Sequence, residues 1–286
     1  MSNSICIICG SENIRNLRFI NIISRYTGIR YPLYRCNSCG LTRPDQNSIK
    51  EMLAVKIYED PKNIRFYDQK KGAIGENEPG YKDYFRHFTI YKDFIKKYNI
   101  KGKGLDIGCG AGHLIKVLSN EGITMEGQDI SFTLIKALKK QGIRVHSGRL
   151  DKIRTKNKYD VITFNQVLEH VEDPEKFIED VKYLLKNKGH ILFAVPYLSG
   201  FVPQILRSYW YGLGYGQHLN FFSKKSLELL LKNKGFDLCE FEVLIVDYTH
   251  PKFPKALNLA IGMFMNLIVK LNLGDNLFVV ARLNKK

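Results

Sequence analysis

Acidic residues are scarce in this chain of 286 residues: 28 Asp and Glu stand against 44 Lys and Arg, which gives a formal net charge of +16. A positive field of this size favours anionic partners, such as nucleic acid, phosphorylated small molecules or an anionic membrane surface. Long basic runs of the kind that grip nucleic acid are absent, because the lysines occur as separate pairs such as Lys139–Lys140 and Lys224–Lys225. The charge pattern therefore argues against nucleic acid as the partner.

Internal repeats, low-complexity tracts and a secretory signal are also absent. The opening residues Met1–Ser4 are not followed by a basic and then an apolar run, so we expect a cytoplasmic protein whose thiols stay reduced. The hydrophobic fraction of 44% supports a large core. At this length we expect one complete α/β domain with a small appended module.

Three alternate glycines mark a candidate ligand site. Residues 105–114 have the pattern of a buried strand that ends in Gly108, Gly110 and Gly112 and continues into a helix. Such glycines let the backbone lie against a ligand, and the start of the helix directs free N–H groups toward it. Asp106 stands before the turn, and its carboxylate suits a ligand that carries an ammonium or a sulfonium group.

A dinucleotide site is the first alternative for this turn, but its pattern is G-x-G-x-x-G. Here the spacing is G-x-G-x-G, with His113 at the next position. A second strand-like segment, residues 125–130, contains Asp129 near its end, and a carboxylate there can accept both hydroxyls of a ribose in either kind of nucleotide site. The spacing and the acid before the glycines favour a site other than that of NAD.

Three successive segments, residues 105–112, 127–131 and 159–171, resemble the motifs of class I S-adenosylmethionine-dependent methyltransferases. The resemblance extends over residues 80–284. It implies an α/β fold, a Rossmann-like seven-stranded mostly parallel sheet with an antiparallel last strand. It also implies that the glycine turn holds the methionine part of the cofactor, and that later motifs bind the ribose and border the adenine and the transferred methyl. The implied cofactor residues are Asp106, Gly108, Gly110, Gly112, Asp129, Ile130, Arg149, Leu150, Asn165 and Gln166.

The rest of the pattern supports strands that alternate with helices, as in a mostly parallel sheet covered on both faces. Apolar runs over residues 160–164, 190–195, 241–246 and 277–281 predict strands. Residues with capping chemistry precede the helical segments, and glycines follow them. The predicted caps are Ser131, Asp173 and Ser223, and the helix after Asp173 is expected to run to about Lys186.

The N-terminal region contains two C-x-x-C-G knuckles, separated by a segment with strand character, as in a zinc ribbon. Two such pairs complete a tetrahedral Cys₄ set that suits zinc and leaves no open position, so the site is expected to be structural. The alternative is a pair of disulfides, which reduced thiols in a cytosolic chain disfavour. The expected zinc ligands are Cys6, Cys9, Cys36 and Cys39.

These features predict a chain in three parts. Residues 1–45 form a zinc-ribbon module, residues 46–80 form a linker, and residues 81–286 form the methyltransferase domain. The stretch from residue 43 to residue 80 looks irregular. Within the domain, an apolar insertion over residues 252–273 separates the last two strands.

The insertion predicts a helix over residues 255–273 with a broad apolar face. Its narrow polar stripe argues against a membrane span, which needs about 20 apolar residues. Three interpretations stay open: the helix packs into the core or a homodimer interface, it lies flat on the inner face of a membrane, or it lines the pocket for a lipid-linked acceptor. The stripe consists of Asn258, Gly262, Asn266 and Lys270.

His218 is the first candidate for a catalytic base. It follows the fifth strand in an aromatic-rich loop, where an imidazole can take a proton from a hydroxyl as the methyl arrives. The alternative is that it hydrogen-bonds the loop. The aromatic side chains either stack on a sugar ring or close the loop over the core. They are Tyr197, Tyr209, Trp210, Tyr211 and Tyr215.

Glu169 and His170 offer a second polar pair after the fourth strand. The segment is similar to the L-E-H-V motif of ubiquinone-pathway O-methyltransferases, in which the acid and the histidine can bind a divalent cation. That motif has another acid three residues earlier, and here the position is Gln166, which weakens the metal interpretation. The alternative is that the pair shapes the turn before the cap at Asp173.

A zinc ribbon ahead of this core, together with the H-L-x-F-F-S segment at residues 218–223, looks like enzymes that modify sugars in bacterial surface-polysaccharide or secondary-metabolite pathways. We therefore expect O-methylation of a nucleotide-linked or lipid-linked sugar. A quinone or other small-molecule O-methyltransferase and a sugar C-methyltransferase are the alternatives. A ribbon that grips RNA for modification is an alternative of another class. The absent N-P-P-[YF] motif, replaced by residues 165–168, argues against base N-methylation.

Overall fold

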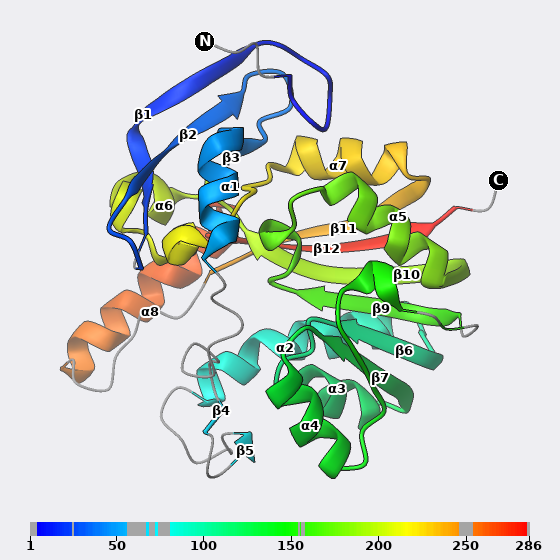
Figure 1. The fold of residues 1–286 in the computed structure, drawn as a ribbon. Helices are drawn as coiled ribbons and strands as arrows, with labels where there is room; N and C mark the ends of the chain where they lie inside the picture. The colour runs from blue at the N-terminus through cyan, green and yellow to red at the C-terminus, as the bar shows by residue number, and fades with distance from the viewer. Residues whose placement is uncertain are drawn as a thin grey trace.

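The computed structural model describes residues 5–24, 26–55, 67–68, 72–73, 81–153, 155, 158–245 and 254–284. A large sheet lies between two layers of helices, and a small N-terminal sheet sits beside it (Figure 1). The large sheet has seven strands in the order β11-β12-β10-β9-β6-β7-β8. Its strands are β6 (Gly102–Ile107), β7 (Ile123–Asp129), β8 (Val145–Ser147), β9 (Tyr159–Asn165), β10 (Leu185–Pro196), β11 (Phe236–Leu244) and β12 (Asn276–Leu283).

The pairing of the strands confirms the predicted fold class. Strands β6 to β10 pair in parallel, whereas β12 inserts between β10 and β11 and pairs antiparallel with both. Because all the parallel strands end at one edge, the loops after β6, β7, β9 and β10 gather there. The predicted site residues follow these strand ends.

Helices cover both faces of this sheet. One buried cluster joins it to α5 and α7, and a second joins it to α2, α3 and α4 (Figure 1). Strand residues such as Leu105, Ile162 and Phe193 are fully buried between the layers, which explains the near-continuous apolar runs in the sequence. The helices are α2 (Tyr81–Lys97), α3 (His113–Ser119), α4 (Phe132–Lys140), α5 (Pro174–Leu184) and α7 (Lys224–Asn233).

Two of the three predicted caps are confirmed. The Asp173 carboxylate accepts a hydrogen bond from the Lys176 N–H, and Ser223 forms a capping box with Ser226. Ser131 occupies the N-cap position of α4, but its side chain makes no capping bond. The helix after Asp173 is shorter than expected, because the chain becomes extended at the first residue of β10 and ends the helix there.

The N-terminal region forms a three-stranded antiparallel sheet of β1 (Ile14–Ile23), β2 (Arg30–Cys36) and β3 (Thr42–Pro44). Helix α1 (Gln46–Ala54) follows directly, so the expectation of an irregular segment from residue 43 is wrong for this part. The physical reason is a cap and a buried face: the Asp45 carboxylate accepts from the Ser48 N–H, and the helix buries its inner side against the small sheet. Only β4 (Tyr67–Asp68) and β5 (Gly72–Ala73) are described between residues 56 and 80.

The small sheet packs against the loop that follows β10. This loop, residues 197–223, contains α6 (Phe201–Leu206) and the short 3₁₀ helices η5 (Arg207–Tyr209) and η6 (Tyr211–Gly216). Trp210 is 1% exposed and lies in a buried cluster with residues of β1, β2 and α1. Thr42 and Phe221 add two backbone hydrogen bonds, of 2.9 and 2.8 Å, between β3 and the end of the loop.

The insertion forms helix α8 (Lys255–Lys270), which projects away from the large sheet (Figure 1). Of its described side chains only that of Ile268 is buried, so the interpretation that α8 packs into the core of this chain is wrong. The side of α8 that contacts the protein is narrow, whereas apolar residues cover most of the circumference of the helix, so most of them stay exposed. No helix in the described parts of the chain has the length and apolarity to cross a membrane.

Candidate active site

The glycine turn lies between β6 and α3, at the edge where the parallel strands end. Gly108, Gly110 and Gly112 have φ angles of 65°, 54° and 79°, in the left-handed region that side chains disfavour. A Cβ at Gly108 or Gly112 would come within 2.6 Å of a neighbouring side chain. A Cβ at Gly110 would enter open space. Packing therefore explains two of the glycines, whereas Gly110 borders open space.

Asp129 closes this turn from the end of β7. Its carboxylate accepts hydrogen bonds from the Gly110 N–H at 2.9 Å and from the Ser131 N–H at 2.8 Å. These bonds use one acceptor direction on each oxygen and leave a second for the hydroxyls of a ribose. Burial raises the pKa of this carboxyl. The adjoining Ile130 is 52% exposed and offers an apolar surface beside the acid.

Asp106 is buried at the end of β6. It accepts a hydrogen bond of 2.7 Å from the Thr163 hydroxyl of β9. Burial raises the pKa of Asp106 to about 7, and the charge of Asp129 acts in the same direction. A cationic ligand nearby would favour the ionised form of this carboxyl, as expected for an acid that faces an ammonium or a sulfonium group.

Sequence reasoning missed Thr163, and it also missed Gln128. The Gln128 side chain accepts from the Gly108 N–H at 3.2 Å and donates to the Gly148 carbonyl, so it links the glycine turn to the loop after β8. Its position directly before Asp129 was the available signal.

The remaining cofactor candidates separate into two groups. Asn165 and Gln166 end β9 at the same edge as the glycine turn; Asn165 accepts from the Tyr91 hydroxyl, and the Gln166 amide donates to Asn276. The Gln166 backbone is left-handed, with φ 54°. Arg149 is exposed and pairs with Asp151, and Leu150 is half-buried at the start of η3 (Leu150–Lys152).

Glu169 is the most unusual group of the site. It lies in the 3₁₀ helix η4 (Leu168–His170) after β9, and its side chain is fully buried. Neither carboxylate oxygen has a hydrogen-bond partner among the described residues. Burial raises the pKa of Glu169 to about 8. A buried carboxyl without partners is costly for stability, and such groups concentrate at functional sites.

Two imidazoles approach this carboxyl. Oε1 of Glu169 lies 3.8 Å from Nε2 of His170 and 4.0 Å from Nε2 of His218, and the two rings are 4.6 Å apart. Backbone carbonyls fix both rings, because Nδ1 of His170 donates to Gln217 and Nδ1 of His218 donates to Gly212. A carbonyl only accepts, so in the neutral rings Nε2 is the acceptor nitrogen, directed toward Glu169. Burial lowers the pKa of His170 to about 4.

The backbone brings these three groups together. The Glu169 carbonyl accepts from the N–H groups of Leu219 and Asn220, at 2.7 and 3.0 Å, and so ties the loop after β10 to the turn after β9. The sequence predicted each of the three side chains separately, but not that they converge. The arrangement suits proton transfer, and its three ligand atoms, which all lie within 4.8 Å of one another, also have the chemistry of a divalent-cation site.

The described aromatic side chains of the loop are not presented together, and the side chain of Tyr215 lies outside the described residues. Trp210 is buried against the small sheet, and the Tyr211 hydroxyl donates to Asp275. Tyr209 is 86% exposed, and Tyr197 is half-buried. The interpretation that Trp210 stacks on a sugar is therefore wrong, because its ring fills the core that the loop shares with β1 and β2.

The four N-terminal cysteines form one cluster. The sulfurs of Cys6 and Cys39, and those of Cys9 and Cys36, are 3.5 Å apart, and all four lie within 4.8 Å of one another. None of the chain's cysteines is in a disulfide. Tetrahedral zinc with bonds of 2.3 Å places its thiolates roughly 3.8 Å apart, so the donor set fits zinc. A hydrogen bond from Cys39 lowers the pKa of Cys6 to about 5, which favours a thiolate.

Comparison with known proteins agrees with this geometry. Residues 84–240 match the family described as a methyltransferase domain. The chain belongs to this family. With its fold and its glycine-turn site, it is a class I S-adenosylmethionine-dependent methyltransferase.

The matches to individual proteins differ in how much of this chain and of the other protein they cover. An uncharacterized protein of Methanocaldococcus jannaschii is 31% identical over 151 residues, which are 51% of this chain and 72% of that protein. The ubiquinone biosynthesis O-methyltransferase of Coxiella burnetii is 35% identical over 107 residues, so the match spans about half, 46%, of that enzyme. The magnesium protoporphyrin IX methyltransferase of Synechocystis PCC 6803, solved with S-adenosylhomocysteine, shares the fold at 16% identity and a TM-score of 0.52, over 82% of this chain and 94% of that one.

Proposed function

We propose that this methyltransferase transfers a methyl group to a hydroxyl of a nucleotide-linked or lipid-linked sugar. The observation that carries the proposal of a hydroxyl acceptor is the convergence of Glu169, His170 and His218 at the edge where the cofactor motifs also end. The zinc-ribbon module and the loop over this edge resemble those of sugar-modifying methyltransferases, which supports a sugar as the acceptor.

The cofactor fits the residues present. Asp106, the turn around Gly110 and Asp129 would hold the methionine and ribose parts, with Asn165 and Gln166 beside the methyl group. S-adenosylmethionine supplies an electrophilic methyl on a sulfonium. The four cysteines would hold one zinc ion with a structural role.

His218 would act as the general base. Its Nδ1 is occupied by the Gly212 carbonyl, so Nε2 is the atom that takes the hydroxyl proton. The resulting imidazolium lies beside Glu169, and an ionised carboxylate at 4.0 Å would stabilise it. His170, whose Nδ1 donates to the Gln217 carbonyl, lies beside the same oxygen Oε1 and would help to keep that carboxyl in place.

A quinone-type O-methyltransferase is the second candidate. The 35% identity to a ubiquinone biosynthesis O-methyltransferase favours it, and so does the cluster of one carboxylate and two imidazoles, which could hold a divalent cation that lowers the pKa of a phenol. In that case activity would be lost with a chelator and restored by a divalent cation.

The acceptor is tested by labelling. The enzyme is incubated with methyl-labelled S-adenosylmethionine and, in parallel, with nucleotide sugars, extracted membrane lipids and phenolic quinone precursors. We expect label in a sugar of the first two samples, in a linkage that resists mild base. Label only in the phenols, dependent on a divalent cation, would establish the second candidate, and label in a carbon–methyl bond would establish C-methylation.

Cofactor binding is tested at the glycine turn. Asp129→Ala should weaken binding of S-adenosylhomocysteine by about 1–3 kcal/mol, the usual loss for a hydrogen bond to a charged group. Gly110→Val should abolish binding, because its side chain would enter the open space beside the turn from a left-handed backbone. Calorimetry measures both, and Asp237→Ala, which removes an exposed acid of β11, is the matched control. Unchanged affinity in both turn variants would exclude this site.

A further inference from the structure

Helix α8 has apolar residues on its outer side as well as on its inner side. On the outer side, Leu259, Met263, Leu267 and Leu271 recur every four residues and are 67%, 67%, 52% and 57% exposed. The side around the buried Ile268 faces the protein and is also apolar. A surface helix of a globular domain normally has a polar outer side. The outer face of α8 is therefore built to contact something outside this chain.

The exposed apolar surface continues beyond α8. The rings of Phe264 and Phe201 are in contact, with centroids 6.1 Å apart, and join α8 to α6. After α6 the Arg207 guanidinium lies 5.5 Å from the ring of Phe19, which joins η5 to β1. We name this surface the α6–α8 face. Its exposed apolar residues are Phe19, Phe201, Ile205, Leu206, Tyr209, Leu257, Leu259, Met263, Phe264, Leu267 and Leu271.

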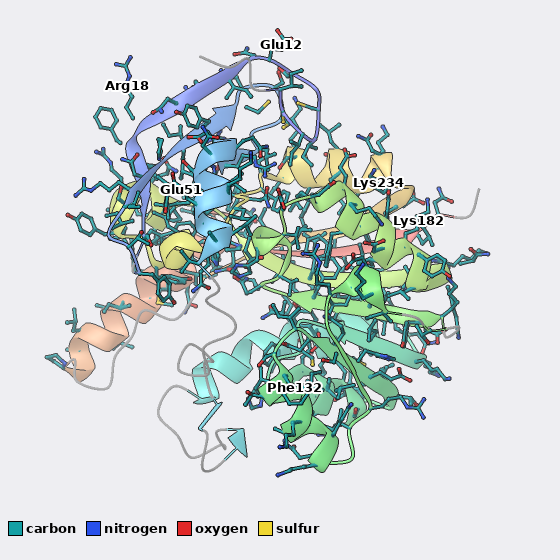
Figure 2. The ribbon with its side chains drawn as sticks, viewed as in Figure 1. Glu12, Arg18, Glu51, Phe132, Lys182 and Lys234 are labelled. Carbon is teal, nitrogen blue, oxygen red and sulfur yellow. The ribbon has the colours of Figure 1, made fainter. Side chains whose placement is uncertain are left out.

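The three segments that form this face contain no acidic residue. Asp and Glu are absent from residues 13–44, from residues 181–227 and from residues 248–274, the stretches of sequence in which these residues lie. Arg18 projects outward from β1 (Figure 2), and Arg207 lies within the face. A large apolar surface with a basic border and without acids fits the interface of an anionic bilayer, where apolar groups insert and cations meet lipid phosphates.

We propose that the α6–α8 face binds the surface of an anionic membrane, with α8 lying flat in the interface. The net charge of the chain favours an anionic membrane over a second copy of the chain as the partner. Each copy carries a net charge of +16, so pairing two such faces would bring like charges together, whereas an anionic bilayer attracts them. The inference goes beyond the proposed function and does not depend on which hydroxyl is methylated.

Flotation with lipid vesicles tests the proposal. The full chain should float with phosphatidylglycerol–phosphatidylcholine vesicles, float less with phosphatidylcholine alone, and detach as salt is raised. Met263→Glu combined with Leu267→Glu should lower the bound fraction by roughly tenfold or more, because it places charges in the inserted face. Tyr183→Glu is the matched control, since Tyr183 is 67% exposed on α5, outside the α6–α8 face.

The flotation results distinguish membrane binding from an interface between two copies of the chain. Wild-type protein that stays unbound at low salt, or a double variant that floats like the wild type, would overturn the proposal. A wild-type dimer that the double variant converts to a monomer, without any flotation, would assign the face to a second copy instead. Melting temperature and S-adenosylhomocysteine affinity, measured on the same variants, should not change, so a failure here is distinct from a failure of the methyltransferase assignment.

Discussion

Replacing His218 with Ala is expected to lower kcat by about 10²–10⁴, the range for loss of a general base. The affinity for S-adenosylhomocysteine should not change, because the hydrogen bond and the ring contacts of this imidazole that fix its place are to Gly212, His170 and Phe221. His218→Asn is the sharper variant: its amide nitrogen takes the place of Nδ1 and can still donate to the Gly212 carbonyl and hold the loop, but the amide cannot accept a proton at neutral pH. Single-turnover rates with saturating cofactor measure both effects.

If His218 has only a structural role, we expect the two variants to differ in turnover. His218→Asn would then retain most of the turnover, and only His218→Ala would lose it. If both variants stay active whereas His170→Ala or Glu169→Gln is inactive, the base assignment moves to that pair. If turnover survives the loss of each of these three side chains, the enzyme would accelerate the reaction only by holding the acceptor close to the methyl group, and the hydroxyl proton would leave to water.

Glu169 should give the reaction its pH dependence. With a pKa of about 8 the carboxyl is neutral at lower pH and ionised above it, and only the ionised form stabilises an imidazolium on His218. The pH dependence of kcat therefore also tests the role of His218. In the wild type, kcat should rise with pH toward a plateau above about 8, and Glu169→Gln should lower the plateau and remove the rise. A wild-type profile that is flat from about pH 6 to about pH 10, roughly two units on each side of this pKa, would contradict this role.

The sequence predicted the part of the fold that depends on local chemistry. The strands, the glycine turn and the caps at Asp173 and Ser223 follow from apolar runs and capping residues that need no distant partner. Helix α1 was missed because its buried side consists mainly of Ile49 and Met52, and the surface that covers them comes from the small sheet. A short helix with so few apolar residues carries little periodic signal.

The site depended more on long-range contacts. The Glu169 carbonyl holds the loop through Leu219 and Asn220, and His170 is bonded to Gln217, which lies 47 residues further along the chain. No local pattern specifies such a pairing. The burial of Trp210 has the same cause. The loop sequence alone suggests that this indole is free to bind a ligand, but residues of the small sheet, far away in the sequence, cover it.

Removing the zinc ion that we propose for the four-cysteine cluster is expected to abolish turnover while cofactor binding is retained. The N-terminal module and the loop after β10 are bonded directly: the Ser223 hydroxyl donates to the Cys39 carbonyl, and Thr42 exchanges two backbone hydrogen bonds with Phe221. His218 lies three residues before Phe221 in the same loop. Because structural zinc contributes about 10–16 kcal/mol of binding free energy in small zinc domains, losing it should release the ribbon and this loop together.

Cys39→Ser should therefore lose zinc and turnover together, while S-adenosylhomocysteine still binds at the glycine turn. Trp210 is the only tryptophan and is buried between ribbon and loop, so its emission should shift to longer wavelength when the ribbon separates. Cys239→Ser, a half-buried cysteine of β11 outside the cluster, is the matched control. Zinc-free protein that keeps full turnover and an unshifted emission would show that the ribbon folds and holds the loop without metal. Zinc that is lost together with cofactor binding would mean that the two parts of the chain unfold as one.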